Sequence, residues 1–263
     1  MSDIKKMLEK AYAKVNIFLK ITGYKDGYHL ISSRFMLVES LHDLMWFEPS
    51  NGRFEIVGDF DCKMEQNTIY KAYKALIHHY PQKEIIQFAK AHKVVVYKNI
   101  PAFAGLGGGS SNAATFLKMM NKAVGLGLTN EELMKVGQDV GADVPFFLSE
   151  CKSANVSGFG EIIQPFDEEP LPLKLMTPDE IRCSTVGVYK TFRKYFADTM
   201  EKNAEDAKEL EKMKSRDILE KYPPEFLNDL FPAALKLCPD LYEHKQESWF
   251  FSGSGSTFFK VDA

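Results

Sequence analysis

A glycine-rich segment constrains this chain more than any other stretch of its sequence. Four of the five residues 105–109 are glycine, and Ser110, Ser111 and Asn112 follow them directly. The segment lies between a β-branched run at Lys93–Tyr97 and a stretch whose apolar residues recur at helical spacing. A flexible linker would not be held between a buried strand and an amphipathic helix, so the sequence predicts a strand, a loop and a helix in that order.

Such a loop is typical of an anion-binding site. Glycine has no Cβ atom, so the backbone can approach a ligand closely. The first N–H groups of a helix have no partner inside the helix, and together with the helix dipole they attract negative charge. The loop is not a Walker A motif, because no Gly-Lys-Ser/Thr follows, and Ser110 stands where the dinucleotide-binding spacing requires its third glycine. The sequence therefore predicts a phosphate cradle of another kind.

The first half of the chain predicts alternating strands and helices. Residues 11–21 alternate strictly between apolar and other side chains, which indicates a strand, and Asp26-Gly27 indicates a hairpin turn. Thr129 and Glu132 form a capping box for a short helix that ends near Gly141. Further elements are predicted as strands at Arg34–Leu41, Leu44–Glu48, Arg53–Val57 and Lys93–Tyr97, and as a helix from Asn67 to His79 capped by Asn67 or Thr68.

The second half has a different pattern. Strands follow the middle of the chain, and charged helical stretches occupy residues 188–237. A last strand pattern at Trp249–Val261 encloses Gly253-Ser254-Gly255. We therefore predict an α+β chain with two domains, residues 1–155 and residues 156–263.

Composition narrows the classes of partner. The 263 residues are 45% hydrophobic and carry a net charge of −3, which gives no overall field for nucleic acid or an anionic membrane. No stretch approaches the ~18 apolar residues of a spanning helix, and residues 1–14 lack the apolar core of a signal peptide. We expect small-molecule partners, neither nucleic acid nor membrane, and a reducing cytoplasm. The cysteines form no C-x-x-C pair and predict neither a zinc ribbon nor a disulfide framework: Cys62, Cys151, Cys183 and Cys238.

Three charged or polar residues are candidates for chemistry. Lys14 and Asn16 share one face of the 11–21 strand, about 7 Å apart. They are either exposed residues or, if the strand is central, members of a site on its second face. Asp143, just before Val144-Pro145, either caps a turn or supplies a reactive carboxylate.

These segments resemble motifs of the GHMP kinase superfamily. Pro101–Ala114 is similar to its ATP-phosphate loop, Ala13–Asn16 to its first motif, and Gly141–Pro145 to the segment that carries its catalytic aspartate. The triple glycine before Ser-Ser-Asn resembles the diphosphocytidyl-methylerythritol kinase branch more than the mevalonate or homoserine kinases. Similarity extends over nearly the whole chain and is densest at 11–29, 98–114 and 139–147.

The resemblance implies a two-lobed fold. The first lobe would be like domain 2 of ribosomal protein S5 and the second a shortened ferredoxin-like lobe, because relatives usually continue beyond the third glycine motif, Gly253–Thr257, whereas this chain ends at Ala263. ATP and Mg²⁺ are the implied co-substrate and ion, with the protein ligands of Mg²⁺ unknown and Ser111 a candidate. The resemblance implies these ATP-binding residues: Pro101, Ala104, Gly105, Leu106, Gly107, Gly108, Gly109, Ser110, Ser111 and Asn112, with Asn67 and Lys98 beside the adenosine. On the residues alone, Asn67 and Lys98 are equally well a helix cap and a strand-end charge.

The resemblance also implies a reaction, the phosphorylation of the 2-hydroxyl of 4-diphosphocytidyl-2-C-methyl-D-erythritol in the non-mevalonate route to isoprenoid precursors. Asp143 would be the general base and Lys14 its electrostatic partner. The implied substrate-binding residues are Asn16 for the polyol, Tyr28 and His29 of the Asp-Gly-Tyr-His segment for cytosine, and Thr185 and Tyr189 on the other side of the pocket. A homoserine or mevalonate-type kinase, and a nucleotide-binding protein without catalysis, are the alternatives. A monomer or weak homodimer is expected.

Overall fold

A computed structural model describes residues 8–262, so the first half of the N-terminal segment considered for a signal peptide, residues 1–14, lies outside it. Within it the chain forms two compact units. One contains residues 1–13, 39–100 and 108–150, and the other contains residues 14–38, 101–107 and 151–263. We call them unit 1 and unit 2. The division of the chain into two domains at residue 155 stays a prediction.

Two long strands supply residues to both units. They are β1 (Glu9–Lys25) and β2 (Tyr28–Pro49), which pair with each other. The turn between them is the predicted Asp26-Gly27 hairpin, whose φ values of 52° and 90° lie in the left-handed region that a two-residue turn requires.

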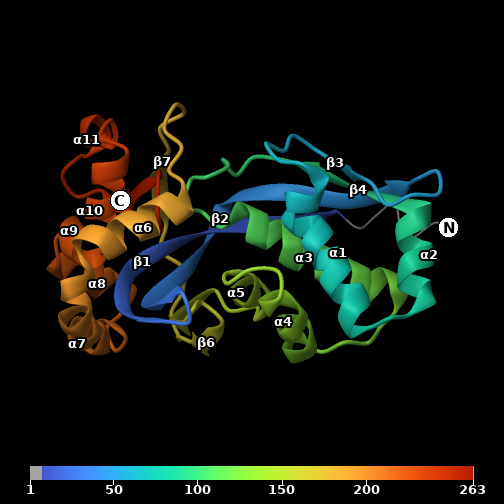
Figure 1. The fold of residues 1–263 in the computed structure, drawn as a ribbon, viewed down its shortest axis with the longest axis horizontal. Coiled ribbons are helices and arrows are strands. Elements are labelled where there is room, and N and C mark those ends of the chain that lie inside the picture. Colours follow the sequence, from blue (N-terminus) through green and yellow to red (C-terminus); the bar gives the residue numbers. More distant parts are fainter. Residues whose placement is uncertain (1–7, 263) are drawn as a thin grey trace. The chain divides into compact units, whose positions relative to one another are not determined.

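Unit 1 combines a small sheet with helices that cover it (Figure 1). The end of β2 pairs antiparallel with β4 (His92–Tyr97), and β4 runs parallel to β3 (Ile56–Val57). Helices α1 and α3 pack against each other. The helices of the unit are η2 (Met64–Gln66), α1 (Thr68–His79), α2 (Lys83–Ala91), α3 (Gly108–Val124), α4 (Asn130–Gln138) and α5 (Val144–Leu148).

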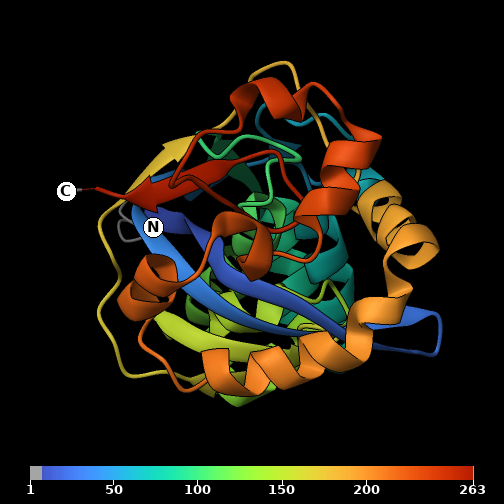
Figure 2. The ribbon, with the colours of Figure 1, turned by 90° about the vertical axis from the view of Figure 1, so that its left-hand side faces the viewer.

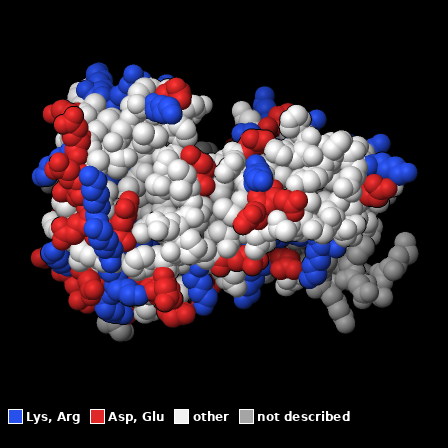
Figure 3. Space-filling model, turned by 90° about the horizontal axis from the view of Figure 1, so that it is seen from below, with Lys and Arg blue, Asp and Glu red and all other residues white. Residues whose placement is uncertain are grey.

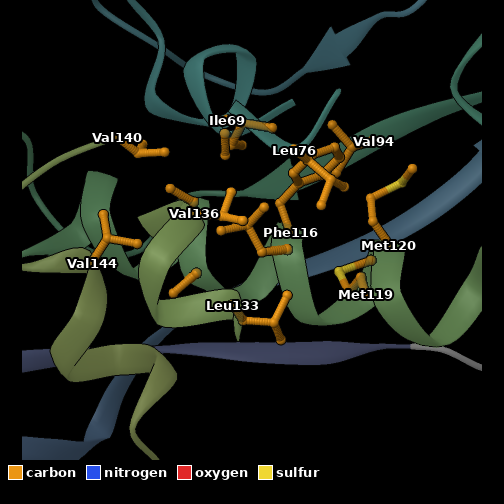
Figure 4. Close-up of a cluster of buried hydrophobic side chains, with 14 of the residues drawn as sticks. Ile69, Leu76, Val94, Phe116, Met119, Met120, Leu133, Val136, Val140 and Val144 are labelled. Carbon is orange, nitrogen blue, oxygen red and sulfur yellow. The ribbon is translucent and has the colours of Figure 1, made fainter. Parts of the chain in front are cut away.

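The core of unit 1 explains why these helices form. Phe116 of α3 is fully buried and points into a cluster of side chains from α1, α4 and β4 (Figure 4). Leu76, Val94 and Val136 reach the same cluster from those three elements. Their burial at helical or strand spacing holds α3, and with it the start of the helix that follows the glycines, in one place.

Unit 2 contains the rest of β2 and most of the C-terminal half (Figure 2). Residues 31–36 of β2 pair antiparallel with β5 (Ser153–Gly158), which pairs with β6 (Ile162–Pro165). A separate sheet has the order β7 (Leu173–Met176), β9 (Phe258–Val261), β8 (Phe250–Phe251). The helices of the unit are α6 (Thr185–Tyr195), η3 (Ala197–Thr199), α7 (Met200–Leu210), α8 (Ser215–Lys221), α9 (Pro224–Leu227), α10 (Phe231–Leu237) and α11 (Leu241–His244).

Local predictions are largely confirmed. The 11–21 strand lies within β1, Asn67 caps α1 by accepting from the amide of Ile69, and both bonds of the Thr129–Glu132 capping box form at α4. The last strand pattern forms as β8 and β9 around the 253–255 glycines.

Three local predictions were wrong. The strands predicted at Arg34–Leu41 and Leu44–Glu48 are one strand, β2, in which Asp43 is buried and its carboxylate accepts backbone hydrogen bonds. The Arg53–Val57 strand is confined to its last two residues. No helix was predicted where α2 lies, and the helix that follows the glycines, α3, begins at Gly108.

Two further observations concern the charged surface and the helices. Basic and acidic side chains are intermixed on the face shown in Figure 3. Among residues 8–262, no helix is both long enough and apolar enough to cross a membrane.

Candidate active site

The start of α3 forms one side of the predicted cradle, in unit 1. A Cβ atom on Gly108 would lie 2.8 Å from the side chain of Ile100, so only glycine fits there. The carbonyl of Gly109 accepts a hydrogen bond of 2.6 Å from the hydroxyl of Thr68, which ties α3 to α1. The first amides of α3 have no partners inside the helix, as an anion site requires.

The preceding part of the loop lies in unit 2, where two glycine segments pack together. Gly105 has φ 75°, and a Cβ atom on it would lie 2.2 Å from the carbonyl oxygen of Ser252. The Ser252 hydroxyl donates to the Gly105 carbonyl at 3.1 Å, and the amide of Thr257 donates to Ala104 at the same distance. The predicted third glycine motif therefore holds residues 104–105 of the phosphate loop.

Lys14 and Asn16 are buried on β1, with exposures of 4% and 1%. The Lys14 ammonium donates to Asn16 Oδ1 at 2.7 Å and to the Gly105 carbonyl at 3.3 Å, and Asn16 Nδ2 donates to Ser33 Oγ at 2.9 Å. The backbone amide of Lys14 also donates to the carbonyl of Leu106. The interpretation of Lys14 and Asn16 as exposed residues is therefore wrong, and their membership of a site stays a prediction.

Asp143 lies at the N-cap position of α5, in unit 1. In the described chain its side chain makes no capping hydrogen bond to α5, and its role as a reactive carboxylate stays a prediction. The segment is close to the start of α3, since a Cβ atom on Gly141 would lie 4.0 Å from Ser110 Oγ. Asp143 and the predicted phosphate-binding serines thus belong to one neighbourhood of unit 1.

The two residues predicted beside the adenosine have structural partners in unit 1. Asn67 is 6% exposed and caps α1 through the amide of Ile69 at 2.9 Å. Lys98 donates to Asn112 Oδ1 at 2.9 Å and forms a short ion pair with Asp43. Sequence reasoning missed Asp43, which the sequence places between two predicted strands with no local pattern that marks it.

The residues predicted to bind cytosine surround an aromatic cluster in unit 2. His29 lies 5.0 Å from the ring of Tyr24 and 5.2 Å from that of Tyr189, and Tyr28, 69% exposed, packs on Phe159. Tyr189 is therefore a neighbour of His29 in this cluster, and the binding of cytosine there stays a prediction. Burial lowers the pKa of His29, and the charge of Arg193 lowers it further, so the imidazole is neutral in neutral solution.

Thr185 lies at the start of α6, which Ser184 caps through the amide of Gly187. Its hydroxyl shares a hydrogen bond of 2.9 Å with Ser254 Oγ of the third glycine motif. The Ser184-Thr185 segment is therefore fixed to the same loop that holds Gly105.

Comparison with known proteins agrees with these motifs. The model of the GHMP kinases N terminal domain matches residues 67–150. A protein from Sulfurovum sp. (strain NBC37-1), named 4-diphosphocytidyl-2-C-methyl-D-erythritol kinase, is 49% identical and the match covers 95% of this chain and 97% of that protein. A protein of the same name from Sulfurimonas denitrificans is 47% identical, with 98% of each covered.

Solved structures show the same relationship. A crystal structure of 4-(cytidine 5'-diphospho)-2C-methyl-D-erythritol kinase is 26% identical, with a TM-score of 0.70 over 97% of this chain and 90% of that one. A mevalonate kinase, 12% identical with a TM-score of 0.63 over 98% of this chain and 92% of that one, shares the fold. The α+β prediction and the family prediction are confirmed. The chain belongs to the 4-diphosphocytidyl-2-C-methyl-D-erythritol kinase family of the GHMP kinases.

Proposed function

We propose that the chain transfers the γ-phosphoryl group of ATP to the 2-hydroxyl of 4-diphosphocytidyl-2-C-methyl-D-erythritol, giving the 2-phosphate and ADP in the non-mevalonate route. One observation carries the proposal. A buried strand holds the ammonium group of Lys14 against the glycine-rich loop, hydrogen-bonded to Gly105 and Asn16. An ammonium group is costly to bury, and this one is buried where it donates to the loop that is predicted to bind phosphate, which supports a role there.

The chemistry follows from what phosphoryl transfer requires. Charge spreads over the phosphoryl oxygens in the transition state, so catalysis depends on positioning and on cationic or N–H stabilisation. Asp143 accepts the proton of the attacking hydroxyl, and Lys14 favours the ionised carboxylate and the developing negative charge. Asn16 orients the polyol, and the amides of residues 107–110 bind the phosphates.

The other residues predicted to bind ATP belong to the same loop, and Asn67 and Lys98 bind beside the adenosine. The cytosine base lies at Tyr28, His29 and Tyr189, with Thr185 towards the methylerythritol end. Stacking binds any base, whereas a hydrogen bond from His29 to the pyrimidine edge discriminates among bases.

Mg²⁺ is the proposed ion of the reaction, and it would neutralise phosphate charge. Within residues 8–262, no group of three or more His, Cys, Asp or Glu side chains is arranged to hold a metal. At nucleotide sites Mg²⁺ uses few protein ligands and is bound mainly by phosphate oxygens and water. The hydroxyl of Ser111, at the start of α3, is the candidate protein ligand.

ATP and the cytidine-linked polyol are the proposed partners of a cytoplasmic monomer or weak homodimer.

A coupled assay of ADP release tests the proposal. Wild-type protein is expected to turn over the diphosphocytidyl alcohol and neither homoserine nor mevalonate. Asp143→Asn is expected to lower kcat by roughly 10²–10⁴-fold because the general base is lost. Lys14→Ala is expected to lower it by about 10²-fold or more, because a preorganised cation is lost.

Matched controls come from the same elements. Asp139→Asn removes an exposed carboxylate four residues before Asp143, and Lys10→Ala removes an exposed ammonium from β1. Both controls should keep wild-type kcat. Near-normal turnover by Asp143→Asn or Lys14→Ala would remove that residue from the mechanism, and absence of acceptor-dependent ADP release would contradict the reaction itself.

A further inference from the structure

Asp43 collects four hydrogen-bond donors in the interior of unit 1. The residue is completely buried in β2. Oδ1 accepts from the backbone amides of Asn99 at 2.7 Å and Ile100 at 2.8 Å. Oδ2 accepts from the side-chain amide of Asn112 at 2.8 Å and from the ammonium of Lys98.

These donors come from the two flanks of the glycine-rich segment. Asn99 and Ile100 are the last residues before it, and Asn112 lies in the first turns of α3, which begins at Gly108. Lys98 links the two flanks a second time, because its ammonium also donates to Asn112 Oδ1 at 2.9 Å. One carboxylate therefore joins the entrance and the exit of the loop.

A glycine-rich loop needs such an anchor. Its glycines have no side chains to pack, and they lose more backbone entropy on ordering than other residues do. Contacts at its two ends therefore help to set its conformation, in addition to the bonds that Ser252 and Thr257 make to residues 104–105. The anchor must also leave the site attractive to an anion, and a buried carboxylate would oppose that unless a cation balanced it. Lys98 supplies that balance.

We propose that Asp43 is a positioning residue for ATP, which sets the start of α3 by joining both flanks of the phosphate loop and balancing Lys98. The inference rests on the proposed function, in which this loop binds the triphosphate. A purely structural role, a link between β2 and β4, is the alternative. Glu48 and Lys93 make such a link at the far end of the same strand pair, at 3.1 Å on the surface.

The experiment compares Asp43→Asn with Glu48→Gln. Asp43→Asn keeps one oxygen for the two backbone amides but directs an NH₂ group at two donors, Asn112 Nδ2 and Lys98. The KM for ATP is expected to rise about tenfold or more, with the KM for the acceptor within about twofold of wild type. Glu48→Gln breaks an ion pair between the same strands and should leave both KM values unchanged.

A double variant separates positioning from packing. Asp43→Asn/Asn112→Asp exchanges the two side chains and again matches donors with acceptors, because the carboxylate then accepts from both the new amide and Lys98. It is expected to recover most of the ATP affinity lost in Asp43→Asn. Failure to recover it, in a variant with the wild-type melting temperature, would overturn the inference.

Hydrogen exchange on the wild-type chain keeps the inference testable if Asp43→Asn does not fold. The amides of Asn99 and Ile100 are expected to exchange more slowly when a non-hydrolysable ATP analogue is bound, and to be unaffected by the acceptor. Unchanged exchange would overturn the inference. So would a folded Asp43→Asn variant with a wild-type KM for ATP, or with both KM values raised equally.

Failure of the proposed function can be distinguished from failure of this inference. If the proposed function is wrong, wild-type protein releases no ADP with the diphosphocytidyl alcohol. The role of Asp43 is then measured by calorimetry as the Kd of the ATP analogue for wild type and Asp43→Asn. An unchanged Kd would contradict the inference whatever the acceptor is.

Discussion

At the scale of single residues, the candidate site depends on polar groups that the fold buries. His29 is an example, because its Nε2 atom is buried and has no hydrogen-bond partner among the described residues. A buried polar atom without a partner is unfavourable, and such atoms are often completed by a ligand. His29→Phe keeps a ring beside Tyr24 and Tyr189 but removes that atom. We expect the KM for the acceptor to rise roughly fivefold, since a hydrogen bond contributes about 1 kcal/mol, while the melting temperature stays the same or rises.

The control for this prediction is His92→Phe, which changes a histidine stacked on Phe88 in unit 1 and should leave the acceptor KM unchanged. The lowered pKa of His29 adds a pH expectation. Because burial and the charge of Arg193 lower the pKa of His29, the contribution of His29 to the acceptor KM should be constant from neutral to alkaline pH. A drop in the melting temperature of His29→Phe with no change in KM would show that the residue serves packing alone.

At the scale of elements, the phosphate loop is held by a second glycine loop. Gly105→Ala would place a Cβ atom against the Ser252 carbonyl in addition to forcing a side chain into the left-handed region. The strain alone is about 1–2 kcal/mol. Gly127→Ala carries that strain without the collision, because Gly127 has φ 69° and open space around it. We expect Gly105→Ala to lose about 1–3 kcal/mol more unfolding free energy than Gly127→Ala.

Chemical denaturation of the two variants measures this difference. Gly105→Ala should also raise the KM for ATP, because residues 101–107 would shift, whereas Gly127→Ala should not. Equal losses of stability in the two variants would show that the loop can move away from Ser252 at little cost.

At the scale of the whole molecule, a buried ion pair in unit 2 joins segments that lie far apart in the sequence. Arg34 of β2 is fully buried and donates to Glu168 at 3.1 Å, to Asn155 at 2.7 Å and to the carbonyl of Glu211 at 3.0 Å. Burial alone would raise the pKa of Glu168, but hydrogen bonds from Ser215 and Ser153 and the charge of Arg34 outweigh it, and the pKa lies below its usual value. The residues joined are up to 181 positions apart in the chain.

The lowered pKa predicts acid sensitivity. The unfolded chain takes up a proton on Glu168 at a higher pH than the folded chain does. Glu168 therefore contributes stability that is present above its unfolded pKa, near 4.5, and is lost as the pH falls through the folded pKa. Glu168→Gln is expected to lose roughly 3 kcal/mol at neutral pH and to have a flatter stability curve from about pH 5 to about pH 3.

Glu169→Gln is the matched control, since the neighbouring carboxylate is 87% exposed and pairs with Lys152 on the surface. It should follow the wild-type curve. Parallel acid unfolding of Glu168→Gln and wild type would show that other carboxylates control the acid limit.

The sequence by itself determined the local structure and the family. The 11–21 strand, the Asp26-Gly27 hairpin, the cap at Asn67 and the Thr129–Glu132 capping box depend on residues at most a few positions apart, so their patterns are readable along the chain. The glycine-rich motif is also local, because glycine is required wherever a backbone must approach a ligand or another backbone.

Only the tertiary structure decided which side chains meet. Asp43 and Asn112 are 69 positions apart, as are Thr185 and Ser254, and the thiols of Cys183 and Cys238 lie 3.4 Å apart across 55 positions. The burial of Lys14 likewise depends on segments remote from β1, such as Gly105. No periodicity marks such pairs, because a contact between distant positions is fixed by the packing of whole elements and not by the spacing of neighbours. The sequence therefore predicted most residues of the candidate site, whereas only the fold showed that Asp43 accepts hydrogen bonds from both sides of the phosphate loop.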